Sequence, residues 1–418
     1  MNQFIVDVYA IVNVLFLCWY IFNKGLKLSP GVIILAFYVL IAVLGIPAYE
    51  MLKTDQFFYK FDFSNITVLP YVFYFIASLA LIKPIFGMEQ SVDNAHIAIS
   101  YKKVVFFIYL YIVCAFVSGY LYYKTITTSG MLLDMASARM DVYNGEQINA
   151  YSNSFERFFL SFAAHMNIPA TIIFFLALSR FRKCFNKFLL FLLGMAVIIP
   201  PFGDAVRTVS RGMVITLIIQ LVLAYSFFSK DISKKLKKIF VIALSILLVG
   251  VLAYSIFVTN ERFGEGADSN SSLICYWGQP PIIFNSQVVT INEYAYGARF
   301  FYPIADFLGL DTRILDVLAN HHWGPCFTTL IGDIWIDYSI FGVVLVCIFV
   351  PRFINRFKFK KHMSIPDIYV LVYYCLLIQH GALVTGYGLC QSVGFAILFY
   401  FVLKYMTQPL SGDKEMVS

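Results

Sequence analysis

Long apolar runs recur along the whole chain, and they restrict its fold more than any other feature. A run of about 18 or more apolar residues is long enough to cross the roughly 30 Å hydrocarbon core of a bilayer as a helix. Only 13% of the residues are charged, against about 25% in soluble domains. A transmembrane barrel would instead alternate apolar and polar residues. The sequence therefore predicts an all-α polytopic membrane protein, with residues 1–418 forming a single integral membrane domain.

About eleven spans are expected. The first begins almost at Met1 without a basic stretch or a small-residue cleavage site, so it is expected to be a retained helix. Pro200 and Pro201 cut the sixth span short, and helix breakers at membrane depth are tolerated where the backbone is buried in protein or lines a wet cavity. The expected spans are 4–22, 31–51, 66–82, 104–123, 155–179, 187–202, 212–229, 238–258, 326–350, 366–383 and 388–406.

The basic residues are divided unevenly between the two sides of these spans. The loops after spans 1, 3, 5, 7 and 9, together with the C-terminal segment, hold 21 of the 31 Lys and Arg residues, and the opposite loops hold 10. Because cytoplasmic loops carry the excess of positive charge, we expect the N-terminus outside and the C-terminus inside a bacterial cytoplasmic membrane. The net charge of +7 then faces lipid head groups and does not indicate a nucleic-acid partner.

The kind of basic residue also differs between the two sides. Lysine dominates the last three inner loops, whereas every outer basic residue after Lys124 is arginine. Lysine is a hydrated point charge, but the planar fork of arginine binds carboxylate or phosphate through two hydrogen bonds. The outer side therefore has the chemistry of an anion-binding surface.

The longest segment between spans, residues 260–325, is predicted to be a large extracytoplasmic loop. It contains a run with the spacing of one helix face, which Gly309 ends, and Asp311 can cap a second short helix over 314–318. Two such amphipathic helices would lie flat on the bilayer or on the mouth of the bundle. The apolar residues of the first are Phe300, Phe301, Ile304, Phe307 and Leu308.

A shorter outer loop, residues 203–211, carries two arginines. Arg207 and Arg211 are four residues apart, so on a helix they would share one face. Two cations on one face repel each other unless an anion lies between them, so this spacing favours an anion-binding site. The alternative to such a site is that both side chains extend to the membrane interface.

Further polar residues follow the long loop. Asp333 and Asp337 are four residues apart near the outer end of the ninth span. Carboxylates in a membrane helix are costly and usually functional, the alternative here being a solvated helix end. His321 and His322 lie nearby, but the spacing matches no HxxxH or HExxH pattern, so we expect neither a metal nor another cofactor.

A disulfide between Cys275 and Cys326 can form if the long loop is extracytoplasmic, because disulfides persist in that oxidising environment.

Several reaction types lack their sequence signals. There is no GxSxG motif and no glycine-rich nucleotide loop. An arginine-rich outer site with a histidine as general base remains. Arginines that stabilise the charge of a departing diphosphate would suit a transferase with a lipid-diphosphate donor, which reaches the site from within the membrane.

Two stretches resemble the Wzy family of bacterial polysaccharide repeat-unit polymerases and, more distantly, the O-antigen ligases. The first is Val209-Ser210-Arg211-Gly212, which opens an apolar helix. The second is His321-His322 followed by Phe327 through Gly342, which ends in Asp337-Tyr338-Ser339-Ile340-Phe341-Gly342. At Ser339 the chain departs from the family, in which glycine is commoner.

The resemblance implies a GT-C-like helical fold and a metal-independent glycosyl transfer from undecaprenyl diphosphate to the next lipid-linked repeat unit. It implies as partners the lipid-linked oligosaccharide, membrane lipids and a chain-length regulator protein. Arg211 with His321 or His322 would be catalytic, and Asp333 and Asp337 would contact the acceptor. The diphosphate would be held by Arg207, Arg211, Arg299 and Arg313.

Two other classes stay open. A flippase for lipid-linked oligosaccharides would show twofold repeats and charges buried within spans, and the sequence shows neither clearly, although His165 is one central candidate. A membrane acyltransferase would place a catalytic His or Arg near the early spans and take its donor from the inner face. The ligases remain a third, related alternative.

Overall fold

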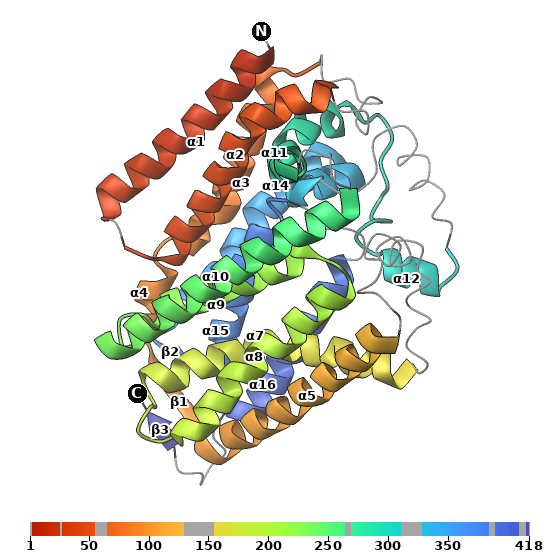
Figure 1. The fold of residues 1–418 in the computed structure, drawn as a ribbon. Coiled ribbons are helices and arrows are strands. Elements are labelled where there is room, and N and C mark those ends of the chain that lie inside the picture. The colour runs from red at the N-terminus through yellow and green to blue at the C-terminus, as the bar shows by residue number, and fades with distance from the viewer. Residues whose placement is uncertain are drawn as a thin grey trace. The chain divides into compact units, whose positions relative to one another are not determined.

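The computed structural model describes residues 2–25, 27–54, 65–128, 154–263, 269–310, 328–383, 389–408 and 415–417 (Figure 1). Nine helices in this part of the chain are long and apolar enough to cross a membrane. Two shorter apolar helices, Gly212–Phe228 and Ile365–His380, correspond to the remaining two expected spans. The prediction of an all-α polytopic membrane protein is confirmed.

The elements carry the labels of Figure 1. The helices are α1 (Asn2–Lys24), α2 (Pro30–Thr54), α3 (Val68–Ile82), α4 (Met88–Asp93), α5 (Tyr101–Thr128), α7 (Ser154–Ser179), α8 (Lys187–Arg207), α9 (Arg211–Phe228), α10 (Lys234–Phe263), α11 (Ser269–Ser286), α12 (Tyr302–Phe307), α14 (Thr329–Lys358), α15 (Ile365–His380) and α16 (Leu389–Thr407). The strands are β1 (His96–Ser100), β2 (His362–Met363) and β3 (Glu415–Val417).

The described chain forms two compact units, each assembled from separate segments. The first comprises Met1–Met88, Asn270–Phe359 and Tyr374–Ala396. The second comprises Glu89–Ser269, Lys360–Tyr373 and Ile397–Ser418. The first unit therefore contains α1 to α3, α11, α12 and α14, and the second contains α5, α7 to α10 and the strands.

In the first unit, α11 packs closely against α2. A Cβ atom added to Gly278 would lie 2.3 Å from the carbonyl oxygen of Leu44, so only glycine permits this approach. The Asn285 side chain accepts a hydrogen bond from Thr67 N (3.1 Å) and donates one to Thr67 O (2.7 Å), which fixes the start of α3. Small residues and side-chain amides are what bring helices together where no water drives the packing.

The described parts of the segment 260–325, residues 260–263 and 269–310, contain more helix than a loop would. The helix α10 extends to Phe263, and α11 occupies 18 further residues. The residues of α11 from Gly278 to Ser286 are buried. Hydropathy misses α11 because Ser, Asn, Gln and two prolines interrupt its apolar pattern. The first predicted amphipathic helix exists as α12, and Gly309, with φ +62°, follows it as expected. The second predicted helix lies outside the described residues.

The double proline does not end the sixth span, contrary to the expected boundary at residue 202. The helix α8 continues through Pro200 and Pro201 to Arg207. Proline lacks an N–H, so these two residues cannot donate to the carbonyls of Ala196 and Val197 four positions earlier. Two side chains from other helices donate instead: the Tyr111 hydroxyl to Ala196 O (3.2 Å) and the Asn167 amide to Val197 O (2.6 Å).

These donors belong to a polar network inside the second unit. The Asn167 amide also donates to the Tyr111 hydroxyl (2.7 Å), and the Gln220 amide donates to Asn167 Oδ1 (2.6 Å) and Thr171 Oγ1 (2.7 Å). The network joins α5, α7, α8 and α9. Freed backbone groups in a membrane helix are tolerated because neighbouring side chains bond them again, and the network does this for α8.

A small sheet, which the sequence does not predict, brings together three distant segments of the second unit. β1 lies between the other strands, parallel to β2 with His96 opposite His362 and antiparallel to β3 with Ser100 opposite Glu415. The strands are two to five residues long, too short to produce a periodic pattern.

Replacing Asn167 with leucine should lower the free energy of unfolding by about 1–2 kcal/mol, because it leaves the Val197 carbonyl without its donor. Pro201→Ala restores an N–H at the position that normally bonds this carbonyl. The cost of Asn167→Leu should therefore be smaller in the Pro201→Ala background, measured by unfolding in detergent. Asn23→Leu, at an exposed position of α1, is the control. An equal cost in both backgrounds would contradict this account of α8.

Candidate functional site

Arg207 ends α8 and is paired within its own helix. Its Nη2 and Nε groups both donate to Asp204 Oδ1, at 2.7 and 3.1 Å, and both side chains are about one-fifth exposed (20%). Arg211 begins the next helix, α9. The two arginines therefore do not lie on one helix face, and the expected loop 203–211 is instead the last turn of α8, a three-residue turn and the start of α9. Asp204 is the anion beside Arg207.

The turn between these helices has a rare backbone conformation. Val209 has φ +49° although it is β-branched, which makes it a true outlier. Its side chain is buried against Val258, Ile126 and Tyr254. The Tyr254 hydroxyl donates to Ala205 O at 3.0 Å and so holds the end of α8 from α10. Tertiary contacts thus impose the strained turn that separates the two arginines.

A second polar cluster lies in the first unit around Arg299. The Arg299 side chain is 5% exposed, and its Nη2 lies 2.5 Å from Asp333 Oδ1 and 3.0 Å from Thr328 Oγ1. The Thr328 hydroxyl in turn donates to Asp333 Oδ1. Arg299 thus already has a carboxylate partner, and a diphosphate would have to compete with Asp333 for it.

Asp337 binds the backbone of the segment that contains Arg299. Its two oxygens accept hydrogen bonds from the amides of Arg299 (3.1 Å) and Phe300 (2.9 Å). Ala295 N donates to Ile336 O at 2.8 Å, and Cys390 N donates to Phe300 O at 3.2 Å. Asp333 and Asp337 are both buried, so neither is a solvated helix end. They attach residues 295–300 to α14, which places the start of α12.

Strained backbone surrounds this second cluster as well. Tyr296, Thr329 and Ser339 have φ values of +49°, +56° and +59°. Ser339 also has ψ −167°, where α14 is kinked, a region that essentially only glycine occupies. With Val209, these are all the non-glycine residues with positive φ in the described part of the chain. Such strain costs roughly 1–3 kcal/mol per residue and tends to cluster at functional sites.

The remaining predicted site residues have no described geometry. Arg313, His321 and His322 lie outside the described residues, as does Cys326, and Cys275 is buried in α11. Arg207 and Arg211 belong to the second unit, whereas Arg299, Asp333 and Asp337 belong to the first. Within the described residues no group of three or more His, Cys, Asp or Glu side chains could hold a metal ion.

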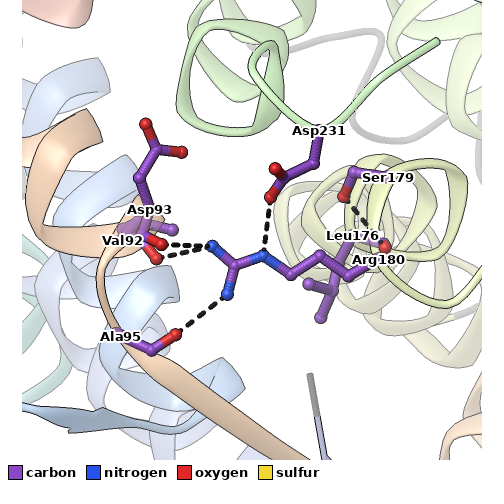
Figure 2. Close-up of polar contacts among 7 residues, drawn as sticks. All are labelled: Val92, Asp93, Ala95, Leu176, Ser179, Arg180 and Asp231. Atoms are coloured by element: carbon purple, nitrogen blue, oxygen red, sulfur yellow. Dashed lines mark hydrogen bonds and ion pairs between the residues drawn. The ribbon is translucent and has the colours of Figure 1, made fainter.

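Arg180 lies at the centre of another polar cluster. From the sequence it counts only as one of the positive charges of the inner loops, which orient the protein in the membrane. Figure 2 shows its guanidinium between three segments of the second unit. Nε donates to Asp231 Oδ2 (2.9 Å), Nη1 to Ala95 O (3.0 Å), and Nη2 to Val92 O (2.8 Å) and Asp93 O (3.2 Å). Its side chain is buried at 8% exposure. The fork of arginine therefore fixes the segment that leads from α4 into β1 against the α7–α8 and α9–α10 turns, which is a structural role.

Comparison of the chain with protein-family models, curated proteins and solved structures gives no match.

Asp333→Asn should lower the free energy of unfolding by about 3 kcal/mol, because it removes the carboxylate charge that lies against a buried guanidinium. The double variant Arg299→Met with Asp333→Leu should cost less than Asp333→Asn alone, since neither charge then stays buried and unpaired. Glu156→Gln is a matched control at the more exposed pair with Lys124 (3.7 Å), where about 0–1 kcal/mol is expected. Unfolding in detergent gives all three values, and a double variant less stable than Asp333→Asn would refute the pairing.

Ser339→Gly should raise the free energy of unfolding by about 1 kcal/mol, because glycine adopts φ +59° and ψ −167° without steric strain. Ser339→Ala keeps a Cβ atom and should give no such gain, so it separates backbone strain from loss of the hydroxyl. A gain with alanine equal to that with glycine would show that the conformation is not strained.

Proposed function

We propose that this protein is a polysaccharide polymerase. It transfers a growing glycan from undecaprenyl diphosphate to the next lipid-linked oligosaccharide repeat unit, at the outer face of a bacterial cytoplasmic membrane. The membrane-embedded helical architecture is compatible with a donor and an acceptor that both arrive within the bilayer.

The observation that carries this proposal is where the strained residues fall. Val209 lies inside the Val209–Gly212 stretch that resembles the polymerases, and Thr329 and Ser339 lie inside the stretch from Phe327 to Gly342. Resemblance in sequence and strain in the backbone are independent signals. Their coincidence supports functional roles for both stretches, since strain persists where the surrounding structure and function require it.

Ser339 adds a more specific argument. It is the position at which this chain departs from the family, which more commonly has glycine there. Its φ and ψ are those that glycine adopts without cost. A backbone conformation that favours glycine at this position supports the resemblance, although the residue differs.

In the proposed reaction the acceptor hydroxyl forms a bond to the anomeric carbon of the donor glycan, and the bond from that carbon to the diphosphate oxygen breaks. His321 or His322 takes the hydroxyl proton as general base. Arg211 and Arg207 stabilise the charge that develops on undecaprenyl diphosphate as it leaves. Asp204 holds Arg207, so the diphosphate binds there by replacing the carboxylate charge with its own larger charge.

One observation favours a transporter as the second candidate. A flippase is expected to bury charges within its spans, and Arg299, Asp333 and Asp337 are buried beside or within the first turns of α14. The two functions differ in product, because a flippase moves single repeat units whereas a polymerase joins them.

Arg211→Ala should abolish chain extension while single-repeat glycolipid still reaches the surface, because the leaving diphosphate loses its cation. Arg211→Lys should remain poor if two parallel hydrogen bonds are required. Gel analysis of surface glycan in a deletion strain that expresses each variant gives the result. Arg182→Ala, at an exposed position after α7, is the matched control. Normal ladders with Arg211→Ala would exclude the proposed role, and loss of single-repeat glycolipid would favour the flippase.

A further inference from the structure

A crevice with a volume of about 510 Å³ lies between α1 and α3 in the first unit. This volume falls within the ~300–1,000 Å³ range of ligand pockets in proteins. One wall is formed by Phe4, Val8 and Val12 of α1, and the other by Val68, Val72 and Phe75 of α3. The side chains of Phe4 and Val68 are 69% and 57% exposed, so the crevice opens on the surface of the unit.

The floor and the far end of the crevice are closed by aromatic contacts. The rings of Tyr9 and Tyr71 are stacked with centroids 4.5 Å apart, and both side chains are buried. Phe16, one turn beyond Val12, contacts the edge of Phe75 at a centroid distance of 5.9 Å. The two helices thus meet behind the crevice and at one end of it.

The surroundings determine what can enter. Both walls belong to helices that are long and apolar enough to span the membrane, so the crevice opens to hydrocarbon. The described residues that line it include no charged side chain, which disfavours an ionic ligand because desolvating a charge there would have no compensation. Residues 4 to 12 of a helix extend about 12 Å along its axis. That is most of the roughly 15 Å depth of one leaflet, half of the ~30 Å hydrocarbon core.

We propose that one acyl chain of a membrane phospholipid lies in this crevice. The chain runs parallel to α1 and α3, as acyl chains lie in a leaflet, and fills the space that the two helices leave in front of the Tyr9–Tyr71 pair. The closed end at Phe16 and Phe75 limits the occupant to about one leaflet in length, which an acyl chain matches and a long polyisoprenoid exceeds. This site does not depend on the proposed polymerase activity.

Photolabelling of the full-length protein tests this site. The protein is reconstituted in phosphatidylethanolamine and phosphatidylglycerol vesicles that contain a phosphatidylethanolamine with a diazirine in one acyl chain. After irradiation, peptides with residues 4–12 and 66–75 should carry more label than peptides from α10. Residues Ile246 and Val249 of α10 are 70% and 67% exposed, so simple contact with lipid would label α10 more strongly. Label in proportion to exposure would overturn the proposal.

A filling substitution gives the second arm. Val72→Trp places an indole in the crevice and should cause loss of label from residues 4–12, whereas Val249→Trp, on the exposed face of α10, should leave it unchanged. Unfolding in detergent reports whether each variant is folded, and Val8→Phe fills the crevice from the opposite wall if Val72→Trp is not. Unchanged label in a folded filled variant would refute the site.

Competition separates the two kinds of lipid chain. Excess unlabelled phosphatidylethanolamine should displace the label, and undecaprenyl phosphate at the same concentration should not do so more effectively. Displacement by undecaprenyl phosphate alone would mean that the crevice holds an isoprenoid chain, and the phospholipid assignment would then be wrong.

Discussion

A backbone carbonyl inside hydrocarbon has no water to bond, so it needs a partner from the protein. The hydrogen bond from the Asn167 amide to the Val197 carbonyl meets this need where Pro201 removes the usual donor. Because that carbonyl and its neighbour are bonded, α8 passes through two prolines and continues to Arg207. The last turn of α8, which carries Asp204 and Arg207, therefore depends on a polar network two turns deeper in the second unit. Side chains of α5, α7 and α9 in this network thus determine where the end of α8 lies.

Arginine has three different roles in the described structure, and its surroundings distinguish them. Arg180 donates mainly to backbone carbonyls and joins turns, which is a purely structural use of its fork. Arg207 and Asp204 are partly exposed, so their pair can exchange with a ligand at small cost. Arg299 and Asp333 are almost fully buried, and such a pair is weak evidence for stability because desolvation offsets most of its attraction. The role of this pair is to position the chain, because together with Asp337 it holds residues 295–300 against α14.

Hydropathy was enough to predict the class of protein and a helix for every expected span, because the membrane imposes one length and one composition on each. It failed where tertiary contacts decide the outcome. No residue near Pro200 in the sequence indicates that Tyr111 and Asn167 will bond the freed carbonyls, so the predicted helix ends at residue 202, before the observed end at Arg207. The helix α11 could not be predicted from hydropathy because protein, not lipid, surrounds its polar residues Gln279, Asn285 and Ser286. The cost of burying Asp333 and Asp337 could be predicted from their place in an apolar helix. Their shared partner Arg299 could not, because it lies 38 residues from Asp337 in the sequence, farther than a local motif reaches. Arg180 had no signal beyond its charge.

The two features of the first unit, its crevice and its buried charges, meet through α3. Phe73 of α3 packs edge-to-face on Trp335 of α14 at a centroid distance of 5.4 Å, and Trp335 stands two residues from both Asp333 and Asp337. Val72, next to Phe73, lines the crevice on another side of the same helix. Asn285 also holds the start of α3, and Tyr9 of α1 stacks on Tyr71, so the face of α3 that lines the crevice is the one without a helix packed on it. An ordered acyl chain in the crevice supports α3 on the other side as well. The carboxylates that hold Arg299 belong to α14, and α3 packs on α14 through Phe73 and Trp335. Support for α3 therefore adds to the rigidity that a site built from buried charges requires.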